Sequence, residues 1–177
     1  MSRQRATERD LRGTMRGFAT GVAIATTFAD TDGGRRHDAV TVNSLTSVSL
    51  NPPLVSLCFG RESRFLADLL ESKVWAASIL DGGASYLARR FAQERDSRTT
   101  SLSALGATAG EHTGALVLDA PAWLECVLQA AHDIGDHTMV VGEVVAAGTR
   151  PDGTRLVFLH GAFHVLDNPN SRQGDLT

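Results

Sequence analysis

The stretch of residues 41–59 constrains the fold more than any other part of the chain. In its first half, residues 41–49, small polar side chains alternate with apolar ones at the period of two that is typical of a β-strand. Such a strand turns Val42, Leu45 or Val48 toward a core. The neighbouring hydroxyl and amide groups stay free to form hydrogen bonds, so we expect a wall that can hold a flat polar ligand.

The pair Pro52-Pro53 ends this strand, because neither proline has an N–H group and each fixes its own φ. The apolar run 54–59 then predicts a second, buried strand.

Cys58 lies in this run and Cys126 in another apolar strand pattern, far from any C-x-x-C spacing. We therefore expect two reduced cysteines in the core rather than a disulfide or a catalytic pair.

Length and charge narrow the possible functions. The 177 residues suit a single domain, 1–177, with flexible ends at about 1–10 and 168–177. The 17 basic and 20 acidic residues give a net charge of -3 without a basic run, which disfavours nucleic-acid binding. The apolar stretches are only as long as strands, and the polar start lacks the apolar core of a secretory signal. We therefore expect no membrane association and a cytoplasmic location.

The rest of the chain alternates short amphipathic helices with strand patterns. Thr7 and Asp10 form the pattern of a capping box, at the start of a helix that Gly21 ends. The polar, glycine-containing segment 95–114 predicts a mobile loop. Hairpin-scale connections, rather than repeated helical crossovers, favour an antiparallel barrel over a doubly wound sheet. Further helices are predicted at 63–71 and 85–93, and strands at 22–28, 39–44, 74–80, 123–131, 138–147 and 155–166.

Common catalytic motifs do not occur in the sequence. No G-x-G-x-x-G follows a strand, and neither a P-loop nor a G-x-S-x-G elbow is present, so nucleotide-fold and hydrolase interpretations lose their main support. Three polar groups of residues remain as candidates for chemistry. They are the wall at 41–49, the segment 60–65 at a predicted helix start, and the segment 133–138 that leads into a strand.

Taken in chain order, these segments resemble the flavin reductase family of two-component flavin-dependent monooxygenases. The resemblance covers nearly the whole chain. It implies a mainly β, antiparallel Greek-key split barrel of the FMN-binding type with a few short helices, paired as a homodimer. The matching segments are Phe18-Ala19-Thr20-Gly21-Val22, residues 41–49 with Asn51-Pro52-Pro53-Leu54-Val55, Arg90-Phe91-Ala92, Gly135-Asp136-His137 and Gly142-Glu143-Val144.

The resemblance implies an NAD(P)H:flavin oxidoreductase, which reduces a diffusible flavin and supplies it to a separate monooxygenase component. The family's common habit favours FAD over FMN and NADH over NADPH. Hydride transfer needs two stacked rings and excluded water rather than a nucleophile, so the absence of a catalytic triad fits. Two alternatives stay open. One is a flavoprotein of the same fold that retains its flavin and acts on another small molecule; the other is a non-catalytic flavin-binding module.

The resemblance also assigns roles to individual residues. His137 is expected to lie by the flavin and the nicotinamide and to position the hydride donor. The helix start at 60–65 suits the flavin phosphates, because free N–H groups, the helix dipole and an arginine all attract anions. The expected flavin-binding residues are Asn43, Ser44, Leu45, Thr46, Ser47, Gly60, Ser63, Arg64, Phe65, Arg98, Asp136 and His137.

Each assignment has a simpler structural alternative. The wall could be an edge strand whose hydroxyls face water, and Ser63 could be an N-cap beside a solvated Arg64. Asp136 could hold His137 in a turn without a ligand nearby. A metal site at 132–137 is disfavoured, because its acidic and histidine residues surround a glycine turn without regular i, i+4 spacing.

Overall fold

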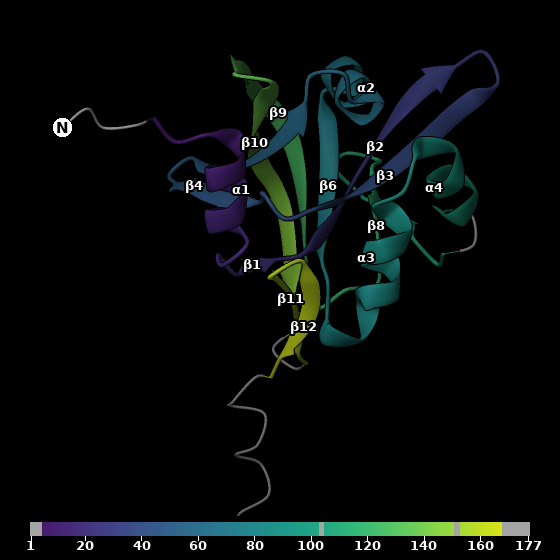
Figure 1. Ribbon diagram of the computed structural model, residues 1–177. Coiled ribbons are helices and arrows are strands. Elements are labelled where there is room, and N and C mark those ends of the chain that lie inside the picture. Colours follow the sequence, from purple (N-terminus) through teal and green to yellow (C-terminus); the bar gives the residue numbers. More distant parts are fainter. Residues whose placement is uncertain (1–4, 103–104, 151–152, 168–177) are drawn as a thin grey trace, which may run out of the picture.

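The computed structural model describes residues 5–102, 105–150 and 153–167 (Figure 1). Its helices are α1 (Glu8–Met15), α2 (Arg64–Ser72), α3 (Ser85–Phe91) and α4 (Arg95–Leu102), with a 3₁₀ turn η1 at Gly82–Ala84. Its longer strands are β2 (Ala23–Thr31), β3 (Gly34–Val42), β4 (Thr46–Leu50), β5 (Pro53–Gly60), β6 (Val74–Ile79), β9 (Ala122–Ile134) and β10 (His137–Thr149). The shorter strands are β1 (Thr20–Gly21), β7 (Thr108–Ala109), β8 (Leu116–Val117), β11 (Arg155–Leu159) and β12 (Ala162–Leu166).

One large antiparallel sheet forms the body of the molecule. Its seven strands follow the order β3-β2-β6-β9-β10-β5-β4, and a three-stranded sheet β1-β11-β12 and a β7-β8 pair complete the fold. The large sheet encloses a core in which Trp75, Phe65 and Leu57 are fully buried. A second core around Ile24, Phe91 and Leu156 lies under α3 and the small sheet. The expected antiparallel barrel with a few short helices is confirmed.

The two edges of the large sheet are connected by a very short segment. β3 ends at Val42 and β4 begins at Thr46, so only residues 43–45 join the first and last strands of the sheet. Four extended residues span about 14 Å at most, so the sheet has to roll up until its edges approach each other. The result is a barrel that is split at residues 43–45.

The prediction of one continuous wall strand over 41–49 is therefore wrong. Residues 43–45 lie between two strands at opposite edges of the sheet, so no single alternation of side chains runs through 41–49. Val42 is buried and Leu45 packs against the core, as the pattern predicted. Val48 is 53% exposed, because β4 is an edge strand whose outer face is uncovered in this chain.

The predicted mobile loop at 95–114 is wrong in its first part, since residues 95–102 form α4. α4 has no strong apolar face, but its arginines pair with two carboxylates in the interior. Arg95 and Arg98 both contact Asp38 of β3, and Arg95 also contacts Asp68 of α2. These ion pairs, together with the buried Leu102 at its end, hold α4 on the barrel in place of a continuous apolar face.

The ends of the chain also differ from expectation. The capping box at Thr7 and Asp10 is confirmed, but α1 ends at Met15 rather than near Gly21. The helix starts within the segment 1–10 that was expected to be flexible, so that expectation is wrong for its last residues. The predicted strand 155–166 is two strands, because His160 and Gly161 both have positive φ and form a turn. Residues 168–177 lie outside the described part of the chain.

The two cysteines differ in burial. Cys126 is fully buried, as predicted, whereas Cys58 is exposed, so its predicted place in the core is wrong. On β5, Leu57 and Phe59 point into the core, and Cys58 between them points to the other face. Burial, followed by the nearby Glu125, raises the pKa of the Cys126 thiol from its ordinary value of 9.0 to about 12.

We predict that Cys126 is inert to thiol reagents in the folded protein. A folded-state pKa above the unfolded value keeps the thiol protonated, so its contribution to stability is complete below pH 9 and is lost as the pH rises toward 12. In a Cys58→Ser variant, a disulfide reagent at pH 8 should label no thiol in the native protein and one thiol after unfolding. Rapid labelling of native Cys58→Ser would contradict the burial of Cys126.

Candidate active site

Two of the predicted polar segments meet at the top of the barrel. His137, the first residue of β10, pairs with Gly60, the last residue of β5. Beyond this pair, the backbone N–H of Arg61 donates to the backbone oxygen of Asp136 at 3.2 Å. The register of β5 against β10 thus places the helix start at 60–65 beside the turn that carries His137.

His137 stands on a tight turn between the two longest strands. Gly135 occupies this turn with a φ of 62°, a conformation that glycine adopts without steric cost. His137 Nδ1 and Asp136 Oδ1 lie 2.8 Å apart, and this hydrogen bond is the main cause that lowers the pKa of the Asp136 carboxyl. With Nδ1 engaged and the side chain half exposed, Nε2 is the ring nitrogen that can meet a ligand.

The wall residues lie along the other edge of β5. Ser44 Oγ accepts a hydrogen bond from the backbone N–H of Cys58 at 3.1 Å and lies 3.4 Å from the Cys58 oxygen. The Thr46 hydroxyl donates to the backbone oxygen of Ser44 at 3.3 Å. Both side chains therefore fix the shape of the wall itself. Asn43 and Ser47 are exposed and can offer side-chain hydrogen bonds to a ligand.

The helix start at 60–65 is built as an N-cap. Ser63 Oγ accepts from the backbone N–H of Leu66 at 3.4 Å, which is the structural role considered for it. Arg64 is exposed at the first position of α2. The Phe65 side chain is fully buried in the core, so only its backbone N–H remains for a ligand.

A cleft of about 370 Å³ opens between this helix start and α4. Arg98 lines it, as does Arg95, which the sequence analysis missed. Arg98 is not a free cation, since its Nη2 lies 3.1 Å from Asp38 Oδ2 and its Nη1 donates to the Gln93 oxygen at 3.0 Å. Burial lowers the pKa of Arg95 below the ordinary value of an arginine, with a smaller opposing effect of Asp38. The cleft is lined by Ser63, Arg64, Glu94, Arg95, Asp96 and Arg98.

Arg95 had a signal in the sequence. Asp38 falls on the same face of its strand as Val40 and Val42, and Asp68 lies between the apolar Leu66 and Leu69 of a helix. Buried carboxylates are rare unless a cation pairs with them. Two such carboxylates predict buried basic partners elsewhere, and the basic residues of 95–98 were candidates.

Residues 15–167 match the family model described as flavin reductase like domain. This match covers most of the chain and includes every segment of the candidate site. The chain belongs to this family.

Individual relatives agree with this membership. The chain is 36% identical, over 155 residues, to an NADH-dependent FAD reductase of Streptomyces globisporus. The aligned region covers 86% of this chain and 82% of the relative. Among solved structures, BorF, the flavin reductase component of a bacterial two-component tryptophan halogenase, superposes with a TM-score of 0.83 at 35% identity. That match covers 92% of this chain and 99% of BorF.

A further structure carries pieces of both nucleotides. The NADH:FAD oxidoreductase SgcE6 of Streptomyces globisporus, in complex with NAD and FAD fragments, superposes with a TM-score of 0.82 at 32% identity. The match covers 93% of this chain and 95% of SgcE6. The resemblance inferred from the sequence motifs is thus confirmed at the level of the family and the split-barrel fold.

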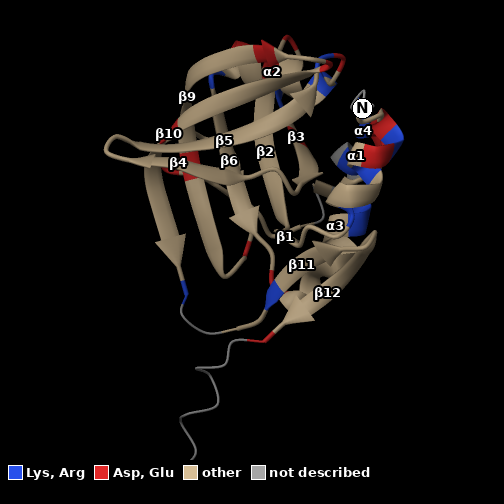
Figure 2. Ribbon diagram, turned by 60° about the vertical axis from the view of Figure 1, so that its left-hand side comes forward, with Lys and Arg blue, Asp and Glu red and all other residues tan. Residues whose placement is uncertain are grey.

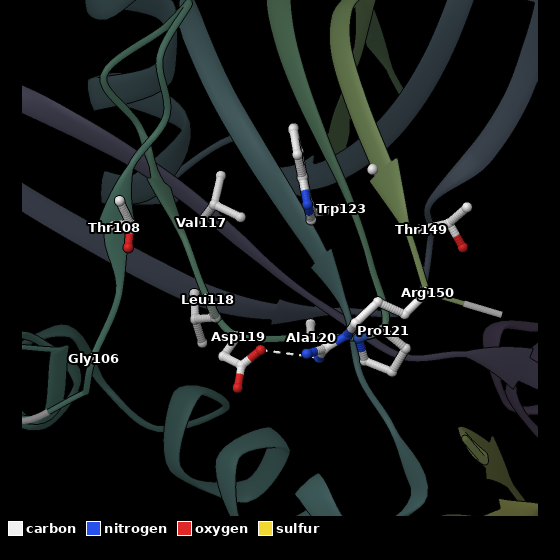
Figure 3. Close-up of a pocket in the computed structure, with 11 residues that line it drawn as sticks. Gly106, Thr108, Val117, Leu118, Asp119, Ala120, Pro121, Trp123, Thr149 and Arg150 are labelled. Atoms are coloured by element: carbon white, nitrogen blue, oxygen red, sulfur yellow. Dashed lines mark ion pairs between the residues drawn. The ribbon is translucent and has the colours of Figure 1, made fainter. Parts of the chain in front are cut away.

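This flavin reductase domain has another cavity at the opposite end of the β9–β10 hairpin (Figure 3). Its volume is about 520 Å³, and Trp123 and an Asp119–Arg150 ion pair of 2.9 Å line it. Strands of 13 residues extend roughly 40 Å, so this cavity lies far from His137. It contains none of the predicted site residues.

Two possible kinds of site find no support in residues 5–102, 105–150 and 153–167. Within these ranges, no three His, Cys, Asp or Glu side chains gather closely enough to hold a metal ion. Within the same ranges, no helix has both the length and the apolar character needed to cross a membrane.

Proposed function

We propose that the protein is an NADH-dependent flavin reductase that reduces diffusible FAD by hydride transfer and releases it to a separate flavin-dependent oxygenase. The observation that carries the proposal is the meeting of His137, the β5 end and the arginine-lined cleft at one end of the barrel. The similarity to an NADH-dependent FAD reductase supports NADH as the hydride donor and FAD as the acceptor. FMN differs from FAD only beyond its first phosphate, so it is the nearest alternative substrate.

The residues of the site fit a flavin nucleotide. A bound flavin supplies the ring that accepts the hydride. Asn43 and Ser47 offer hydrogen bonds for the polar edge of that ring, beside the half-exposed His137. Arg64 and the backbone N–H groups at the start of α2 suit a phosphate, through charge and the helix dipole.

His137 acts in this proposal by positioning the nicotinamide. Asp136 holds Nδ1 of the imidazole, which fixes the ring orientation and points Nε2 away from the turn. Hydride transfer requires the donor and acceptor carbons at near-contact distance. A fixed hydrogen-bond partner for the nicotinamide contributes to rate by restricting its position over the flavin.

We propose that the partner of the reduced flavin is a monooxygenase or related flavin-dependent oxygenase in the cytoplasm, where NADH is available. BorF is the reductase component of a two-component tryptophan halogenase, which supports this kind of partner.

We also propose that the protein is a homodimer. None of the residues of α1, all of which are described, is buried, and Leu11, Met15 and the following Phe18 are each at least 50% exposed. A helix of eight residues is too short to be stable in water on its own, so α1 needs a surface to pack on. The face formed by β4, β5, β9 and β10 carries few charges (Figure 2) and exposes Val127 and Val145.

The proposed activity predicts NADH oxidation that depends on added flavin. Purified protein should oxidise NADH, followed at its near-ultraviolet absorbance, only when FAD or FMN is present, and the rate should saturate with the flavin concentration. The physical reason is that a diffusible flavin leaves its site after each turnover. Oxidation without added flavin by a protein that keeps a bound flavin would instead identify a flavin-retaining enzyme.

Replacement of His137 should separate reduction from binding. We expect His137→Ala to slow flavin reduction by about 100-fold, because a small loss of donor alignment has a large effect on rate. The flavin dissociation constant should rise by less than about threefold. Stopped-flow reduction and flavin fluorescence measure the two quantities. The exposed His132 on the same hairpin provides the control, and His132→Ala should change neither. Equal losses of reduction and binding in His137→Ala would contradict the positioning role.

The dimer proposal predicts a particle of about twice the 18.8 kDa chain mass by light scattering. A Leu11→Glu, Phe18→Glu double variant should shift the protein to the monomer, because two buried carboxylates cannot be accommodated in an apolar interface. Tyr86→Glu, at an exposed aromatic residue of α3, is the matched control and should remain dimeric. A monomeric parent protein at micromolar concentration would overturn this proposal.

A further inference from the structure

The wall of the cleft that belongs to α4 is fixed by charges in the interior of the protein. Asp38 is completely buried, and the side chains of Asp68, Arg95 and Arg98 are each about 10% exposed. Buried ions of this kind are costly unless each one is paired and hydrogen-bonded. Their geometry therefore restricts where α4 can lie.

Asp38 is the centre of the first pair of contacts. Its Oδ2 lies 3.3 Å from Arg95 Nε and 3.1 Å from Arg98 Nη2, while its Oδ1 accepts the backbone N–H of Ala39 at 2.8 Å. Both carboxylate oxygens are thus engaged, and β3 holds two arginines of one helix through a single residue.

Asp68 is the centre of the second pair of contacts. It receives the guanidinium of Arg95 and lies 3.4 Å from Arg36 Nη2. Asp68 is on α2, one helical turn after Arg64, whereas Arg95 is the first residue of α4. The Asp68–Arg95 pair therefore connects the two walls of the cleft directly, and it sets the distance between them.

We infer that Asp38 and Asp68 are positioning residues, which hold Arg95 and Arg98 opposite Ser63 and Arg64 so that the cleft binds the phosphate end of the flavin nucleotide. The inference rests on the proposed function and specifies how the same site recognises its substrate. Both arginines line the cleft, and the five N–H donors of a guanidinium allow it to contact a carboxylate on one side and a phosphate on another.

The fixed positions of the arginines, rather than the net charge of the cleft, have to select the phosphate. The exposed Glu94 and Asp96 also line the cleft, so two of its five charged residues are acids. A guanidinium that is held by buried carboxylates keeps a fixed direction. A phosphate therefore gains most from arginines that are already oriented before it binds.

The inference makes a prediction that depends on the phosphate of the ligand. Replacing Asp68 with Asn removes the charge that orients Arg95 but keeps the side-chain shape. The dissociation constants of FMN and FAD should rise by about tenfold, the effect of losing one charged hydrogen bond. Riboflavin, which has no phosphate, should bind within about twofold of the parent value. Flavin fluorescence without NADH measures all three, and inorganic pyrophosphate should compete with FMN less well in Asp68→Asn.

Control variants separate positioning from general destabilisation. Asp30→Asn removes an exposed ion pair with Arg35 at the tip of the β2–β3 hairpin and should leave all three dissociation constants unchanged. Arg95→Lys keeps the charge and removes the planar fork, so it should resemble Asp68→Asn. Thermal unfolding followed by circular dichroism checks each variant. Asp38 is fully buried, so Asp38→Asn can fail to fold. In that case Asp68→Asn and Arg95→Lys are the variants that test the inference.

The outcomes distinguish this inference from the proposed function. Equal weakening of riboflavin and FMN, or no weakening of FMN, in Asp68→Asn would overturn the positioning role and leave the reductase activity intact. A parent protein that binds FMN no better than riboflavin would overturn it as well. Failure of the parent protein to oxidise NADH with any flavin would refute the proposed function, while the ratio of the dissociation constants would still decide the role of Asp68.

Discussion

The three-residue connection between β3 and β4 is the constraint on which the rest of the fold depends. These strands are the two edges of a seven-stranded sheet, and residues 43–45 keep them close enough that the sheet has to roll up. The rolled sheet encloses the core around Trp75. Ser44 ties the seam at residues 43–45 to the backbone of Cys58 on β5. Asn43 of the seam and Ser47 of β4 are exposed, so polar side chains are available to a ligand here.

β5 connects this seam to the turn that carries His137. One edge of β5 pairs with β4, the other pairs with β10, and its last residue, Gly60, leads into the cap of α2. The polar segments were recognisable in the sequence from turn residues, the N-cap and the alternation of side chains. Their meeting was not recognisable from local pattern, because the pairing of Gly60 with His137 joins distant parts of the chain. Only the resemblance to a family implied it.

The segment at α4 shows where local pattern misleads. A sequence with no apolar periodicity predicts a loop when helices are assumed to pack by hydrophobic faces. Here the packing groups are arginines, and their partners Asp38 and Asp68 lie in other elements. Each partner was visible as a charge at an apolar position of a strand or helix, but neither identified the segment with which it pairs. The ion pairs with Asp38 and Asp68 therefore stabilise a helix in a segment whose local sequence favours a loop.

The two ends of the candidate site depend on different physical effects. The end beside His137 is fixed by backbone pairing and a glycine turn, both of which tolerate many side-chain changes. The end at the cleft is fixed by four buried charged side chains, and each of the two carboxylates contacts more than one arginine. The family resemblance predicted Ser63 and Arg98 as flavin-binding residues, and their contacts show that Ser63 caps α2 and that Arg98 pairs with Asp38. A flavin that contacts both ends is therefore held by a backbone scaffold at its ring and by an ion network at its phosphates, so the two contributions to affinity can change independently.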